Sequence, residues 1–127
     1  MKIESLNTND ISIGVLFFED YTTPYVESSY AELVLAIQAF RPMIDNINKV
    51  QRMIDDSKKL KDGTLYGNCI GENERLISFR DGYFQFYEVT LSPDIYLEIE
   101  QSTWIKLLER LKCFMIDQNS KIYTPQF

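Results

Sequence analysis

The Asp81-Gly82 dipeptide constrains the fold of this chain more than any other feature, because an apolar-rich run lies on each side of it. Asp-Gly is one of the pairs that best fill the two central positions of a type I′ turn, where both residues need positive φ. Residues 75–80 and 83–89 are therefore predicted to form a β-hairpin. The predicted facing pairs are Arg80 with Tyr83, Phe79 with Phe84, and Ile77 with Phe86.

A third strand is predicted over residues 95–99, and the length of its connection to the hairpin decides which of its faces joins the core. A one-residue slip would move every side chain to the other face. A five-residue connection would place Glu98 and Glu100 on the apolar face, and burial of unpaired carboxylates is strongly unfavourable. We therefore expect a four-residue connection, 91–94. The predicted pairs are Thr90 with Ile95, Glu88 with Leu97, and Phe86 with Ile99.

Alternation of side chains along these strands divides the sheet into an apolar face and a polar face. The apolar face consists of Ile77, Phe79, Phe84 and Phe86, with Glu88 at the end of the sheet beside Arg75. The polar face consists of Ser78, Arg80, Tyr83, Gln85, Tyr87, Tyr96, Glu98 and Glu100. Tyrosine offers a large contact area, little rotamer entropy to lose and a polar tip, so this composition is typical of a protein-binding surface. Alternatively, one of the chain's own helices covers this face, as is common in layered folds.

The N-terminal part of the chain predicts one strand followed by a helix. Residues 11–18 alternate at first and are then apolar on both sides, as in a strand near the middle of a sheet. Residues 19–24 break this pattern. Ser29 and Glu32 have the spacing of a capping box, in which each side chain accepts a hydrogen bond from the backbone of the other. We therefore expect a helix to begin at Tyr30.

This helix is expected to be long and broken, extending over residues 30–61. Pro42 removes a backbone donor and restricts Arg41, so the helix either kinks there or ends and restarts. Asp62-Gly63 supplies the stop. The second half has a narrow apolar seam, which suits packing on a sheet edge or another helix and, alternatively, association into a homodimer. The seam residues are Met43, Ile47, Val50 and Ile54.

A strand over residues 64–70 and a C-terminal helix complete the predicted elements. The helix has Ser102 or Thr103 as its N-cap and one apolar face. That face consists of Trp104, Leu107, Leu108, Leu111 and Met115. Residues 1–127 are thus predicted to form a single α+β domain. It contains a mainly antiparallel sheet of about five strands in the order β-α-β-β-β-β-α, with one long Pro-broken helix and a C-terminal helix.

Composition and charge narrow the classes of partner. A chain of 127 residues can bury a sizeable core without disulfides or a structural metal. The formal net charge of −6 argues against a general nucleic-acid binder, whose affinity comes mainly from neutralising phosphates. This charge suits a basic protein partner, although it is also what many soluble domains carry without such a partner. The N-terminus lacks the apolar segment of a signal peptide, and no apolar run is long enough for a transmembrane helix. We therefore expect a cytoplasmic protein without a membrane segment.

The chemically reactive residue types are sparse. The chain has no histidine, which removes the commonest general base and the usual zinc ligand. No phosphate-binding glycine loop or calcium-loop spacing is present. Cys69 and Cys113 are expected to be buried and reduced, with a disulfide between them as the alternative in a secreted protein. The carboxylate pairs are interpreted as solvated surface groups, so we expect neither an enzyme nor a metal or cofactor site. These pairs are Glu98 with Glu100, Asp55 with Asp56, and Glu72 with Glu74.

Two functional hypotheses use the same polar sheet face. The first is a stoichiometric inhibitor or an immunity- or antitoxin-type protein that occupies a basic site on its partner, with carboxylates that speed encounter and tyrosines that supply the buried contact. The second is a single-stranded nucleic-acid platform, on which bases stack against the tyrosines. Aromatic strands suit the second hypothesis, whereas Glu98 and the net charge oppose it. A third, structural hypothesis is a homodimer that is joined through the open sheet face or the apolar helical seam.

Overall fold

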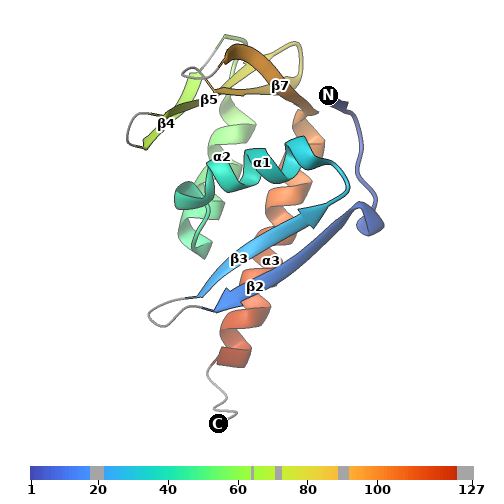
Figure 1. The fold of residues 1–127 in the computed structure, drawn as a ribbon. Coiled ribbons are helices and arrows are strands. Elements are labelled where there is room, and N and C mark those ends of the chain that lie inside the picture. Colours follow the sequence, from blue (N-terminus) through green and yellow to red (C-terminus); the bar gives the residue numbers. More distant parts are fainter. Residues whose placement is uncertain (18–21, 64, 71–72, 89–91, 123–127) are drawn as a thin grey trace.

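The protein is an α+β structure in which three helices lie beneath one face of a five-stranded sheet and a separate two-stranded hairpin projects below them (Figure 1). The computed structural model describes residues 1–17, 22–63, 65–70, 73–88 and 92–122. The strands are β1 (Lys2–Ile3), β2 (Ile11–Phe17), β3 (Thr22–Ser28), β4 (Leu65–Ile70), β5 (Asn73–Arg80), β6 (Tyr83–Glu88) and β7 (Ser92–Glu100). The helices are α1 (Ala31–Ala39), α2 (Ile47–Lys59) and α3 (Gln101–Ile122), and 3₁₀ turns occupy Thr8–Asp10 and Arg41–Met43. None of the described helices is both long enough and apolar enough to cross a membrane.

The predicted hairpin around Asp81-Gly82 is confirmed. Both turn residues have positive φ, 55° at Asp81 and 84° at Gly82, as a type I′ turn requires. The three predicted pairs between β5 and β6 are those of the structure. The strand order is β1-β7-β6-β5-β4, with β1 parallel to β7 and the other neighbours antiparallel.

The predicted pairing of β6 with β7 is wrong by two residues up to Phe86 and by five at Glu88, which pairs with Ser92 and not with Leu97. Thr90, the predicted partner of Ile95, lies outside the described residues. Phe86 pairs with Leu97 and not with Ile99, and β7 begins at Ser92, so part of the predicted connection belongs to the strand. The register shifts at Phe86/Tyr87 and again at Tyr87/Glu88, because β7 carries extra residues there that bulge out of the ladder. A displacement of two residues preserves the faces, so the phenylalanines of β6 still lie on the core side with Leu97.

The segment over residues 11–17 is a strand, but it does not join the main sheet. It pairs with β3, which the sequence pattern did not predict, to form a separate two-stranded sheet. The predicted capping box is also wrong, because α1 begins at Ala31 with Tyr30 as its N-cap and no side-chain capping bond. Ser28 instead accepts a hydrogen bond from the Tyr30 backbone N–H at 3.1 Å.

The long helix is broken around Pro42, as expected, and the break is wide enough to make two helices. Pro42 lies in the first turn of the 3₁₀ segment, and α2 starts afresh with Asn46 as its N-cap. The Asn46 side chain accepts from the backbone N–H of Lys49 at 2.9 Å. The apolar seam of α2 packs inside the protein against α3, and its residues Val50 and Ile54 are buried.

The core lies between the main sheet and the three helices. Trp104 of α3 is fully buried, and its ring centroid lies 5.0 Å from that of Phe86 and 6.4 Å from that of Phe84. On the other side, Phe40 packs edge-on against Phe86 with a centroid separation of 5.8 Å. The four rings are buried and contribute a large apolar area to the core. This aromatic cluster joins β6 to α3 and to the end of α1.

Candidate functional site

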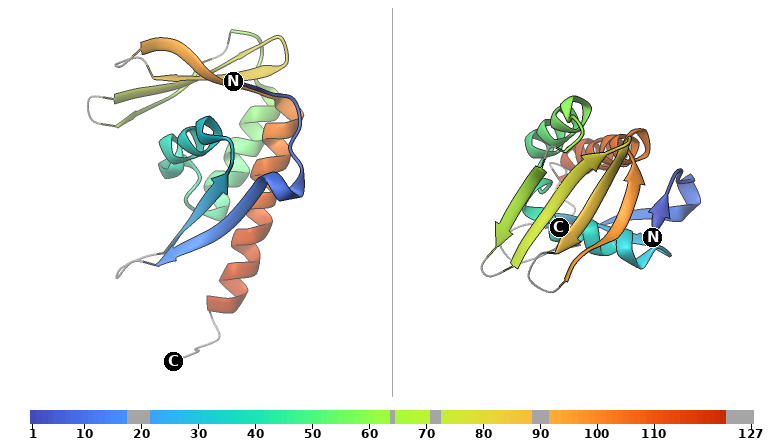
Figure 2. Two further views of the ribbon diagram at one scale, coloured as in Figure 1. Left: turned by 45° about the vertical axis from the view of Figure 1, so that its right-hand side comes forward. Right: turned by 90° about the horizontal axis from the view of Figure 1, so that it is seen from above.

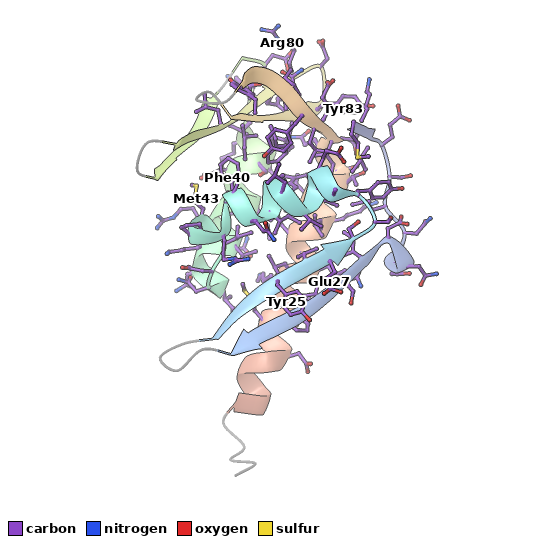
Figure 3. All side chains as sticks on the ribbon, in the orientation of Figure 1. Tyr25, Glu27, Phe40, Met43, Arg80 and Tyr83 are labelled. Atoms are coloured by element: carbon purple, nitrogen blue, oxygen red, sulfur yellow. The ribbon has the colours of Figure 1, made fainter. Side chains whose placement is uncertain are left out.

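The polar face of the main sheet is open. In both views of Figure 2 the three helices lie on the opposite, core-facing side of the strands. The alternative that one of these helices covers the polar face is therefore not the arrangement found in the described part of the chain. Arg80 is exposed and Tyr83 is half-buried, and Figure 3 shows both at the sheet, away from the helical layer.

Hydrogen bonds between neighbouring strands order the polar side chains in the middle of this face. The Ser78 hydroxyl donates to Gln85 Oε1 at 3.0 Å, and Gln85 Nε2 donates to Glu98 Oε2 at 3.4 Å. The three residues come from β5, β6 and β7 and are half-buried. Because the side chains already hold one another, a partner that docks here needs to order fewer of them.

Tyr83 lies between two charged residues from the N-terminus. The Lys2 ammonium is 4.4 Å from the centroid of the Tyr83 ring, and the Tyr83 hydroxyl donates to Glu4 Oε1 at 3.3 Å. Partial desolvation and the nearby Glu4 carboxylate raise the pKa of Tyr83 above 10.0, with Lys2 acting in the opposite direction. Sequence reasoning missed both charged residues, because the two-residue strand β1 leaves only the short alternation Lys2-Ile3-Glu4 as a signal.

The bulge in β7 adds an apolar residue to the open face. Ile95 lies opposite Tyr87, so their side chains share a face, and 43% of Ile95 is exposed. The sequence-based register placed Ile95 opposite Thr90 on the apolar side, and this is corrected. Tyr87 and Ile95 together give the face an aromatic-aliphatic pair of the kind that supplies contact area in protein interfaces.

Tyr96 does not contribute its hydroxyl to this face. It occupies the bulge, where its ring packs against the core cluster and its hydroxyl oxygen is buried. The expected row of three tyrosine hydroxyls is therefore reduced to those of Tyr83 and Tyr87, because the extra residues in β7 change how Tyr96 lies relative to its neighbours.

Glu100 has a structural role as well as a position at the end of β7. Its Oε2 accepts from the Thr103 backbone N–H at 3.0 Å and from the Ser102 hydroxyl, so it caps the first turn of α3. The predicted N-cap, Ser102 or Thr103, is wrong because the helix already begins at Gln101. Burial alone would raise the pKa of the Glu100 carboxyl, but the hydrogen bonds from Ser102 and Thr103 lower it below its ordinary value of 4.5.

The open face, defined here as Lys2, Glu4, Ser78, Arg80, Tyr83, Gln85, Tyr87, Ile95 and Glu98, carries charges of both signs. Lys2 and Arg80 oppose Glu4 and Glu98, so the net charge of −6 is a property of the whole chain and not of this face. A partner that fits here needs a mixed pattern of acidic and basic groups around an apolar contact.

Other reactive groups do not assemble into a site within the described residues. No cluster of three or more histidine, cysteine, aspartate or glutamate side chains is arranged to hold a metal ion in that part of the chain. Cys113 is exposed and free, which corrects the expectation of a buried thiol, whereas the side chain of Cys69 lies outside the described residues. The carboxylates of residues 72 and 74 also lie outside them.

Comparisons with protein-family models, with curated proteins and with solved structures find no match for this chain.

Proposed function

We propose that the protein is a protein-binding module that docks its open face on a basic partner protein, in the manner of a stoichiometric inhibitor or an immunity- or antitoxin-type protein. The observation that carries this proposal is the ordered and uncovered state of the face. Its polar centre is held by the hydrogen bonds from Ser78 to Gln85 and from Gln85 to Glu98, while Tyr87 and Ile95 leave an apolar contact beside it.

Charge would act at two ranges in such a complex. The chain's net charge of −6 attracts a basic partner and increases the rate of encounter, an effect that salt screens. At contact, Glu4 and Glu98 would face lysine or arginine side chains of the partner, whereas Lys2 and Arg80 would fix the orientation and reject uniformly basic surfaces.

The test begins with co-purification from the source cell, followed by mass spectrometry and titration of the recovered partner. Tyr87→Ala is expected to weaken a saturable complex at least about tenfold, because truncation of a central tyrosine in an interface typically costs about 2 kcal/mol. Leu35→Ala is the matched control, because Leu35 is an exposed apolar residue on α1, away from the sheet face. The proposal fails if no saturable partner is recovered, or if Tyr87→Ala binds as well as the Leu35→Ala control.

A titration with a labelled single-stranded oligonucleotide in about 50 mM salt separates protein binding from nucleic-acid binding. A nucleic-acid platform would bind and then weaken steeply as salt rises. We expect no such binding, because Lys2 already occupies one side of the Tyr83 ring and the Glu4 and Glu98 carboxylates would repel phosphates. Light scattering at two concentrations tests whether the open face instead joins two copies of the chain.

A further inference from the structure

The outer edge of β3 is an unpaired strand edge. Among the residues that the structure describes, the hairpin contains β2 and β3 alone, so β3 has a neighbour on one side. In the described part of the chain, the backbones of Tyr25, Val26 and Glu27 make no hydrogen bonds beyond the pairing with β2. Their outward-pointing N–H and C=O groups are therefore able to pair with another extended chain.

A groove follows this edge. Its volume is about 590 Å³, within the range of roughly 300–1,000 Å³ that is usual for ligand pockets. The four consecutive residues Tyr25, Val26, Glu27 and Ser28 all line it. Successive side chains of a strand point to opposite faces, so a single hollow touches all four only if it runs along the strand edge.

Helix α1 and the turn that follows it form the opposite wall. The wall residues Val34, Gln38 and Arg41 are spaced by four and three positions, which places them along one side of α1 and its continuation. Figure 1 shows β3 leading into α1, which turns back above the hairpin. Residues of both elements line the groove.

The floor of the groove is apolar and its walls are charged. The floor residues are Val26, Ile37, Ile44 and Leu111, all of them buried. Within the described residues, the Arg41 guanidinium has no carboxylate partner, and Glu27 is exposed on the strand wall. The groove therefore combines a site for an apolar side chain with an unpaired cation on one wall and a carboxylate on the other.

We propose that this groove binds an extended peptide segment of a partner protein, which adds to the free edge of β3 as a third strand. The backbone of the peptide would pair with Tyr25 to Ser28, while alternate apolar side chains would enter the floor. An acidic side chain of the peptide would face Arg41. Pro24 has no N–H to donate, so pairing is expected to weaken beyond Tyr25.

This groove is separate from the open face. Figure 3 shows Tyr25 and Glu27 on the hairpin and Arg80 and Tyr83 at the main sheet, with α1 between the two places. The peptide proposal thus goes beyond the proposed function, and the two can fail independently. Tyr87→Ala, which is designed to disrupt the open face, is expected to leave peptide binding unchanged.

In the first experiment, a phage-displayed library of random octapeptides is selected for binding to the full chain. The enriched peptides are then synthesised with a fluorescein label, and their affinities are measured. We expect enriched sequences with apolar residues at alternate positions and at least one aspartate or glutamate. Arg41→Gln and Val34→Glu should each weaken binding of these peptides at least tenfold. The matched controls are Arg52→Gln on α2 and Leu35→Glu on α1, which make the same kinds of change outside the groove.

The second experiment tests the strand geometry itself. Peptides that are N-methylated at one residue lose one backbone donor, and in an added strand the donors alternate between facing β3 and facing solvent. Methylation at the positions whose N–H groups face β3 should therefore abolish binding. Methylation at the alternate positions, whose N–H groups face solvent, should change binding less than threefold. On binding, the backbone amides of the β3 edge should also gain protection from hydrogen exchange.

Three results would overturn the proposal. The first is the absence of enrichment over an empty support. The second is enriched peptides whose binding is weakened equally by the groove variants and by their matched controls, or equally by methylation at either set of alternate positions. The third is a concentration-dependent dimer that protects the same β3 amides without any peptide, since the occupant would then be a second copy of the chain.

Discussion

The ring of Tyr25 lies across Gly14 on the neighbouring strand, so close that a side chain at position 14 would collide with it. The two residues pair directly in the hairpin, and a Cβ on Gly14 would lie 2.5 Å from the Cε1, Cζ and Oη atoms of Tyr25. The ring, and not the backbone, therefore favours glycine at this position, since the φ of Gly14 is not positive.

Gly14→Ala should therefore displace the Tyr25 ring and destabilise the wild-type chain by about 1 kcal/mol. In a Tyr25→Ala background the same change should be neutral or stabilising, because alanine is favoured over glycine within a strand by roughly 0.5–1 kcal/mol. Urea denaturation of the four variants in a double-mutant cycle measures the coupling. Equal effects of Gly14→Ala on stability in both backgrounds would show that the position of the Tyr25 ring does not depend on glycine at position 14.

Glu100→Ala should cost about 1 kcal/mol of stability, in the usual range for loss of a helix cap. The reason is that the first turn of α3 would lose the acceptor for the Thr103 N–H. Glu109→Ala is the control, because the Glu109 side chain is 51% exposed and its ion pair with Lys58, at 3.9 Å, is a surface pair of small energy. Chemical denaturation at pH 7 checks both, and similar losses in the two variants would rule out the capping role.

The contribution of Glu100 should also depend on pH. Its pKa in the folded protein is lowered below 4.5, so the stabilisation is fully present above the unfolded-state pKa and declines as pH falls through the folded-state value. The stability difference between the wild type and Glu100→Gln should therefore shrink on going from pH 7 into the acid range below 4.5. A difference that grows with acidification would contradict the lowered pKa.

The raised pKa of Tyr83 predicts opposite effects of its two charged neighbours. Glu4→Gln should bring the tyrosine pKa back towards 10.0, because it removes a nearby negative charge and replaces the charged acceptor of the hydroxyl by a neutral amide oxygen. Lys2→Met should raise the pKa further, because it removes the cation over the ring. NMR titration of ¹³C-labelled tyrosine, with Tyr83→Phe to assign the signal, measures both shifts. A Tyr83 pKa that is unaffected by either change would place the N-terminal segment elsewhere in solution.

Local chemistry made the centre of the fold predictable from the sequence. The Asp81-Gly82 turn fixes the hairpin register, since both turn residues adopt the φ values that the dipeptide favours. The energetic cost of burying Glu98 predicted which side chains of β7 face the core. This prediction is correct for Leu97, Glu98 and Ile99, where the register is displaced by two residues, but it is wrong for Ile95, which lies beyond the bulge. Polarity chooses between the faces of a strand, but it does not distinguish registers that differ by two.

The parts that sequence reasoning missed depend on long-range packing. Proline at position 24 indicated a break in extended structure, yet proline is tolerated on an edge strand such as β3. The strand β1 is too short to produce a pattern, and its pairing with β7 joins residues that are 96 positions apart in the sequence. The groove beside β3 could not be inferred either, because its walls come from segments that meet only in the folded protein.

The parallel pairing of β1 with β7 has a consequence for synthesis on the ribosome. Lys2 and Ile3 are made before their partners Glu98 and Ile99, which lie 96 positions further along the chain. Ile3 is buried in the folded protein, so its apolar side chain has no strand partner until β7 has been made. Closure of this edge is therefore expected to follow synthesis of β7, and a nascent chain arrested before β7 emerges should leave residues 1–3 open to proteases.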